Sequence, residues 1–167
     1  MQNHFDLFGL TPQFDLDLAQ LERAFREVQT QVHPDKFVSA GSAEQRVAMQ
    51  WATRANEAYQ TLKNPLKRAS YLCELHGIGL EAESNTAMPT AFLMQQMEWR
   101  EQLDEARGEH AALLQLEEQI DRARAAQLQQ IGQQFTLTAY PQAAQLIRQL
   151  MFLEKFADDV DHALDAH

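Results

Sequence analysis

The first third of the chain places its apolar residues with the period of an amphipathic helix. Asp15 and Asp17 are acidic residues of the kind favoured where a helix begins, and Pro34 cannot continue one. Between them a single stripe recurs at steps of three and four residues: Leu18, Leu21, Phe25, Val28 and Val32. The spacing predicts a helix from about residue 18 to residue 32, with this stripe in a core.

A second apolar stripe follows a short loop. Ser42, with Gln45 three residues later, is typical of a capping box that opens a helix. Its buried face is predicted to carry Ala48, Trp51 or Ala52, Ala55, Tyr59 and Leu62. Asn64 as cap and Pro65 at the first helical position then begin a shorter helix that ends at Gly77. Its apolar residues are Leu66, Ala69, Leu72 and Leu75. We expect the two long stripes to face each other in an antiparallel hairpin.

The second half of the chain predicts a separate helical unit. Residues 77–89 mix glycine, acids and small polar residues without periodicity, which is typical of a linker. Periodic segments follow at about 90–107, 109–135 and 141–165, the pattern of an antiparallel three-helix bundle. The last has the most regular stripe: Ala143, Leu146, Leu150, Leu153, Ala157, Val160 and Leu164. The chain is therefore predicted to be all-α, with one domain over 1–76 and another over 90–167.

Composition narrows the classes of function. The net charge of -10 argues against nucleic-acid binding, and it is unevenly distributed. Residues 1–75 hold 8 Lys or Arg against 9 Asp or Glu, whereas residues 76–167 hold 6 against 15. One cysteine and dispersed histidines predict no metal site and no cofactor. No stretch has the character of a signal peptide or membrane span, so we expect a cytoplasmic protein without membrane binding.

The tripeptide His33-Pro34-Asp35 lies in the predicted loop of the hairpin. Proline turns the chain sharply, so Asp35 is expected to point outward from a rigid corner, where it can pair with an arginine of another protein. Alternatively, Asp35 only caps a turn and His33 only satisfies the helix end. A catalytic reading is poorer, because proline separates His33 from Asp35 and no third group is evident. We predict that the protein is not an enzyme and has no catalytic residues.

The helix predicted from about Thr90 has apolar residues on two faces. Phe92, Trp99 and Leu103 share one face with Gln96 and Ala106, as core residues do. Leu93, Met94 and Met97 fall on the other side, with Glu98, Glu101 and Glu105, and Phe152 also leaves the stripe of the last helix. These residues either widen the core, or are scattered and exposed without consequence, or form a binding patch rimmed by carboxylates.

Several segments together resemble one family of J-domain proteins. FDLFGL, QVHPDKF, ANEAYQTL and NPLKRASYLCELHG are similar to the J domain of the HscB type, also called Hsc20. The resemblance continues at TAFLMQQMEWREQLDEA and IRQLMFLEKF, so it covers both halves of the chain. The chain resembles the bacterial form, since the cysteine-rich module of some eukaryotic members has no counterpart in this sequence.

The resemblance implies a co-chaperone of iron-sulfur cluster assembly. It implies that a corner of this kind stimulates the ATPase of an HscA-type chaperone of the heat-shock protein 70 family. The chaperone-binding residues would be His33, Pro34 and Asp35, and the neighbouring cations Lys36, Arg23 and Arg26 would add positive charge. It also implies that an IscU-type cluster scaffold binds at Leu93, Met94, Met97, Glu98, Glu101, Glu105 and Phe152. A general J protein serving a DnaK-type chaperone, or a purely structural helical adaptor, would be the alternative.

Overall fold

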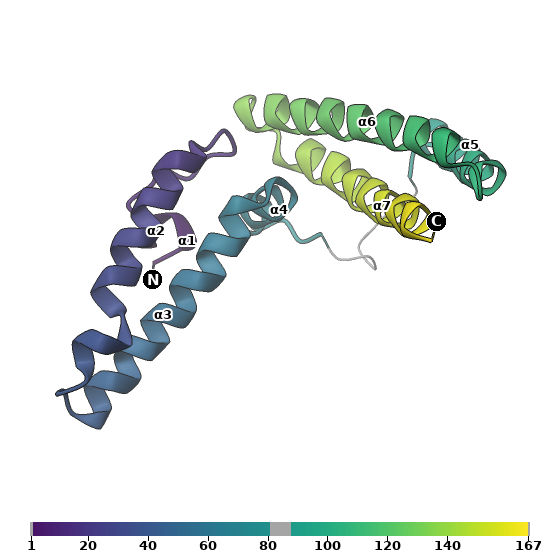
Figure 1. Cartoon of the computed structure of the whole chain (residues 1–167). Helices are drawn as coiled ribbons and strands as arrows, with labels where there is room; N and C mark the ends of the chain where they lie inside the picture. Colours follow the sequence, from purple (N-terminus) through teal and green to yellow (C-terminus); the bar gives the residue numbers. More distant parts are fainter. Residues whose placement is uncertain (1, 81–87, 167) are drawn as a thin grey trace. The chain divides into compact units, whose positions relative to one another are not determined.

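The computed structural model describes residues 2–80 and 88–166, and every regular element in these ranges is helical (Figure 1). The prediction of an all-α fold is confirmed. The elements in chain order are α1 (His4–Leu7), α2 (Leu18–Val32), the 3-10 turn η1 (Pro34–Phe37), α3 (Ser42–Lys63), α4 (Pro65–Leu75), α5 (Thr90–Ala106), α6 (His110–Thr136) and α7 (Tyr140–Asp165). None of the described helices is long and apolar enough to cross a membrane.

The chain divides into two compact units, Met1–Leu72 and Cys73–His167. The three periodic segments of the second half appear as the helices α5, α6 and α7, within a few residues of their predicted bounds. Residues 81–87 of the predicted linker lie outside the described residues, and the predicted domain bounds stay an expectation.

The helices α2 and α3 lie side by side and form the hairpin of the first unit (Figure 1). The carboxylate of Asp17 caps α2 by accepting hydrogen bonds from the amides of Ala19 and Gln20, at 3.0 and 3.3 Å. Leu21 is fully buried, and the ring of Phe25 stacks on Tyr59 of α3 with 4.1 Å between centroids. The predicted stripe of α2 therefore faces α3, although Leu18 at its start is exposed.

The capping box predicted for α3 is wrong. Gly41, not Ser42, is the N-cap, and the Gln45 side-chain amide donates to the carbonyls of Phe37 and Ala40 instead of closing a capping box. Of the two alternatives for the next core position, Trp51 is 36% exposed and Ala52 is partly buried, whereas Ala48, Ala55, Tyr59 and Leu62 are buried as predicted. The physical reason is local packing: within the first eleven residues of α3, only Ala48 is buried. The hairpin has its core near its base and little core at its tip.

The short helix α4 begins as predicted. The side chain of Asn64 accepts a hydrogen bond from the amide of Lys67 at 3.0 Å, and Pro65 occupies the first helical position. Gly77 follows the helix with a φ of 78°, in the left-handed region that glycine adopts without strain. Leu75 was predicted to be in the stripe but is 39% exposed, because it lies in the last turn of the helix.

The second unit is a three-helix bundle in which α6 packs on both α7 and α5. Its core contains Leu103, Leu113, Leu116, Ile120, Ile131, Ile147, Leu150, Leu153 and Val160. The stripe of α7 is wider than predicted, since Ile147 and Phe156 are buried while Leu146 and Leu164 are only partly buried. Arg124 of α6 binds both carboxylate oxygens of Glu154 of α7, at 3.0 and 2.8 Å, and so fixes the pairing of these two helices.

Candidate functional site

The corner between α2 and α3 is held by short-range hydrogen bonds. His33 has extended torsion angles (φ -61°, ψ 136°), which end α2, and Pro34 begins η1 directly after it. The amide of Asp35 donates to Nδ1 of His33 at 3.2 Å, and the amide of Lys36 donates to the carbonyl of His33 at 3.0 Å. The backbone is therefore turned and fixed before any partner arrives.

The Asp35 carboxylate points into solvent with 87% of the side chain exposed. One of its oxygens lies 3.5 Å from Nδ1 of His33. The same nitrogen accepts a hydrogen bond from the backbone amide of Asp35. No lysine or arginine pairs with Asp35 in the described part of the chain. The charge is therefore available to a cation of another molecule.

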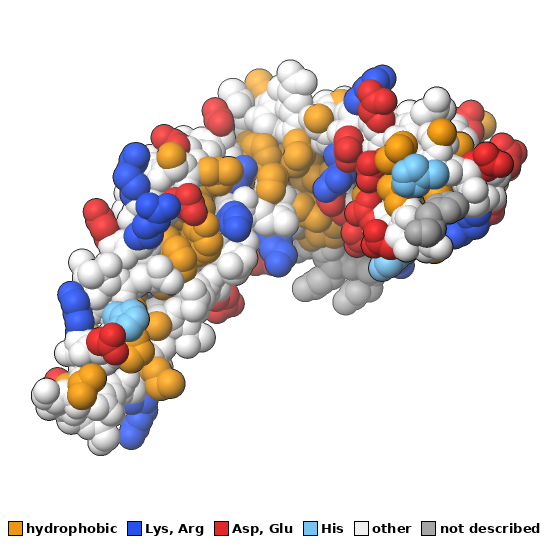
Figure 2. Space-filling model, in the orientation of Figure 1, with side chains coloured by type: hydrophobic (Ala, Val, Ile, Leu, Met, Phe, Trp, Pro, Cys, Tyr) orange, Lys and Arg blue, Asp and Glu red, His pale blue; other side chains and the backbone are white. Residues whose placement is uncertain are grey.

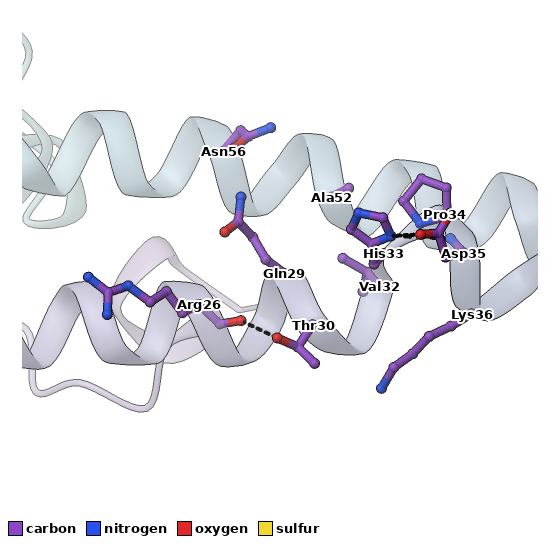
Figure 3. Close-up of a pocket in the computed structure, with 10 residues that line it drawn as sticks. All are labelled: Arg26, Gln29, Thr30, Val32, His33, Pro34, Asp35, Lys36, Ala52 and Asn56. Atoms are coloured by element: carbon purple, nitrogen blue, oxygen red, sulfur yellow. Dashed lines mark hydrogen bonds and ion pairs between the residues drawn. The ribbon is translucent and has the colours of Figure 1, made fainter.

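A groove runs from this corner along the space between α2 and α3 (Figure 3). It encloses about 770 Å³. Its described lining consists of Arg26, Gln29, Thr30, Val32, His33, Pro34, Asp35, Lys36, Ala52 and Asn56. Figure 3 shows the side chain of Gln29 reaching from α2 toward α3. We call this space the corner groove.

The structure brings two of the three predicted cations to the corner groove. Arg26 and Lys36 line it, whereas Arg23 is exposed on α2 and is not among the described residues of its lining. Arg26 forms an ion pair with Glu22 at 3.6 Å, with both side chains more than half exposed. Such exposed pairs contribute little stability, so Arg26 can exchange Glu22 for another anion at small cost.

Sequence reasoning missed the polar residues of the corner groove. Gln29 and Thr30 follow Arg26 by three and four residues, so helical spacing from that arginine would have found them. The sequence alone does not indicate Asn56, because only the register between the antiparallel helices α2 and α3 places it opposite Gln29 (Figure 3). The same register explains why Ala52 lines a groove instead of the core.

A second candidate surface lies on α5. Leu93, Met94 and Met97 are 44%, 64% and 65% exposed, whereas Leu103 and Ala106 on the other face are buried. We call the three exposed residues the α5 patch. The acidic residues predicted to rim it, Glu98, Glu101 and Glu105, are exposed too. The predicted division of α5 into two faces thus holds, and the first of the three alternatives, a wider core, is wrong for these residues.

Phe152, the remaining residue of the predicted scaffold surface, lies on α7 and is 45% exposed. On the face drawn in Figure 2, acidic side chains gather over the second unit, whereas basic side chains are spread over the first. The two units therefore present different chemistry to partners.

The described residues contain no cluster of three or more His, Cys, Asp or Glu side chains that could hold a metal ion. Cys73 is buried, and its burial raises the pKa of the thiol to about 11. This cysteine is consequently protonated at neutral pH and is a poor ligand and a poor nucleophile.

Comparisons with known proteins cover nearly the whole chain. Residues 88–161 match the family model described as the HSCB C-terminal oligomerisation domain. The co-chaperone protein HscB homolog of Burkholderia multivorans is 55% identical over 161 residues, which are 95% of this chain and 91% of that protein. The homolog of Bordetella pertussis is 51% identical over 162 residues, covering 96% and 95%.

Solved structures agree with these relatives. The chaperone HscB from Vibrio cholerae has a TM-score of 0.87 and 37% identity, with 99% of each chain covered. The human co-chaperone protein HscB has a TM-score of 0.91 and 27% identity, covering 96% of this chain and 81% of the human chain.

Proposed function

This chain belongs to the HscB family of J-domain co-chaperones, and from that premise we propose that its two units bind two different partners. Membership makes it a co-chaperone of iron-sulfur cluster assembly that works with a chaperone of the heat-shock protein 70 family. The corner of the first unit binds an HscA-type chaperone and stimulates its ATPase. The α5 patch of the second unit binds an IscU-type scaffold and brings it to that chaperone.

The observation that carries the first assignment is the carboxylate of Asp35, which is exposed on a fixed backbone and pairs with no lysine or arginine of the described residues. A carboxylate that accepts two parallel hydrogen bonds from an arginine forms a strong and directional contact. Since His33 and Pro34 already hold the turn, little conformational entropy is lost when that contact forms. The partner carries out ATP hydrolysis, and this chain contributes binding energy that favours the hydrolysing state.

Charge and flexibility support the second assignment. Methionine side chains adapt to the shape of a partner, and an exposed apolar patch rimmed by carboxylates is typical of a protein-binding surface. The acidic residues around the α5 patch would attract a basic scaffold and repel nucleic acid. We therefore also propose that the protein acts in the bacterial cytoplasm without a nucleic-acid or membrane partner, and that it is not itself an enzyme.

Replacement of Asp35 by asparagine tests the role of the corner. Asp35→Asn keeps the size of the side chain and removes its charge, so stimulation of the chaperone ATPase should be lost while helical content is unchanged. Glu57→Gln is the matched control, because Glu57 is an exposed acid on α3 that does not line the corner groove. Full stimulation by Asp35→Asn would contradict the proposal.

A further inference from the structure

A second, smaller groove lies at the tip of the hairpin, where η1 leads into α3. It encloses about 330 Å³, and its walls include the apolar side chains of Val32, Phe37, Val47 and Trp51. Of the described residues that line it, only Glu44 is charged. We call it the tip groove. In Figure 2 hydrophobic side chains reach the surface at this end of the first unit.

Two of the apolar side chains that line the tip groove are exposed to solvent. Val47 is 51% exposed and Trp51 36%, although either Trp51 or Ala52 was expected in the core. Contiguous exposed apolar residues mark binding surfaces, and tryptophan is among the residues that contribute most to such interfaces. The guanidinium of Arg54 lies 5.1 Å from the centre of the Trp51 ring, and Arg54 also donates to the carbonyl of Gln2 at 3.2 Å. The indole is therefore held in place on one side.

The tip groove adjoins the corner groove. Val32 lines both the tip groove and the corner groove, and it directly precedes His33. Phe37, which lines the tip groove, ends the 3-10 turn that begins at Pro34. Phe37 follows Asp35 by two positions, so a protein that contacts Asp35 also lies near the wall of the tip groove.

We propose that the tip groove is a second contact site for the heat-shock protein 70 chaperone, and that it receives an uncharged apolar side chain of that partner. This inference rests on the proposed function of the corner. The occupant is apolar because the walls are apolar and Glu44 is the lone charge among the described lining residues, which disfavours a charged segment. A hairpin that binds at both grooves would hold the chaperone with one charged contact and one apolar contact.

The test is Trp51→Ser in a titration of ATPase stimulation against co-chaperone concentration. Loss of an apolar anchor should raise the concentration that gives half-maximal stimulation roughly 5- to 30-fold. Met49→Ser is the matched control: Met49 is 69% exposed on the same helix but is not among the described residues of the tip groove, so its replacement should change nothing. Stimulation by Trp51→Ser equal to that of the parent would overturn the inference.

Two further measurements keep the result interpretable. Val47→Asn removes apolar surface from the same groove at a more exposed position, so a weaker effect of the same sign is expected even if Trp51→Ser unfolds. If Asp35→Asn loses stimulation while both groove variants retain it, only this inference fails and the role of the corner stands.

Sedimentation of the parent and of Trp51→Ser tests whether a second copy of this chain occupies the tip groove instead. If the parent sediments as a dimer and Trp51→Ser as a monomer, and stimulation is unchanged, the groove binds a second copy and the proposal is overturned.

Discussion

The corner of the first unit and the α5 patch of the second unit are both exposed, but they are built in opposite ways. The corner presents one carboxylate on a backbone fixed by hydrogen bonds to His33, so its specificity depends on the position of a single charge. The α5 patch presents three flexible apolar side chains on a regular helix, so the affinity of the proposed scaffold contact would depend on the apolar area that it buries. A rigid charged site suits a partner that presents a cation at one fixed position, whereas an adaptable apolar site suits a partner surface of variable shape.

The largest effect is expected from removing the α5 patch. Changing Leu93, Met94 and Met97 to alanine should weaken scaffold binding by one to several orders of magnitude, since each apolar anchor contributes about 1 to 2 kcal/mol. Thermal stability should change little, because all three side chains are exposed. Leu114→Ala, on an exposed leucine of α6, is the control for general loss of apolar surface. An unchanged dissociation constant for the triple variant, measured by calorimetry, would remove the patch from the account.

The opposite face of α5 should respond in the opposite way. Leu103 is 1% exposed, so Leu103→Ala should destabilise the bundle by about 2 to 5 kcal/mol through lost contacts and a residual cavity. Urea unfolding followed by tryptophan fluorescence reports on this unit once Trp51 of the first unit is replaced by phenylalanine in parent and variant, which leaves Trp99, whose ring stacks near Phe156, as the remaining tryptophan. A loss of less than about 1 kcal/mol would mean that the two faces of α5 are not distinct.

A smaller effect is expected from the cap of α2. Asp17→Ala removes the acceptor for two backbone amides and should cost about 1 kcal/mol of stability in the first unit. Asp17→Ser keeps a capping oxygen and should recover most of that loss. Stimulation of the ATPase should stay normal in both variants at temperatures where the unit is folded. Reduced stimulation by a folded Asp17→Ala variant would show that the corner depends on the whole helix.

The smallest effect is electrostatic. Glu98, Glu101 and Glu105 should speed association of a basic scaffold at low salt, and screening should reduce this advantage as ionic strength rises. Replacing the three by glutamine should lower the association rate a few-fold at low salt and hardly at all at high salt. Stopped-flow measurement of the association rate at two salt concentrations distinguishes electrostatic attraction from an apolar contribution, because an apolar contribution would not weaken as salt rises.

Much of the fold follows from the sequence because helical periodicity is a strong local signal. In the stripe of α2, Leu21 is buried and Phe25, Val28 and Val32 are partly buried. The cap at Asn64 is confirmed by a hydrogen bond. The corner could be located because proline restricts the backbone whatever its surroundings. The exposed face of α5 could be separated from the core because successive residues of a helix are rotated by about 100°, which assigns each residue to one side.

The errors concern properties that local pattern does not determine. Trp51 has the spacing of a core residue, but the tip of the hairpin has too few buried neighbours to cover it. Ser42 has the spacing of a cap, yet the torsion angles place the N-cap at Gly41. Asn56 and Ala52 line the corner groove because of the register between α2 and α3, which depends on packing of both helices together. Packing between helices decided the positions of Trp51, Asn56 and Ala52, whereas the backbone of the loop before α3 decided the cap.

The independence of the two surfaces is the central claim, and one crossed experiment tests it directly. ATPase stimulation without scaffold and scaffold affinity would be measured for Asp35→Asn and for the triple alanine variant of the α5 patch. The account predicts that Asp35→Asn loses stimulation but binds the scaffold like the parent, and that the triple variant stimulates normally but loses scaffold affinity. If either variant is folded and yet loses both activities, the two units do not bind separate partners and the account is contradicted.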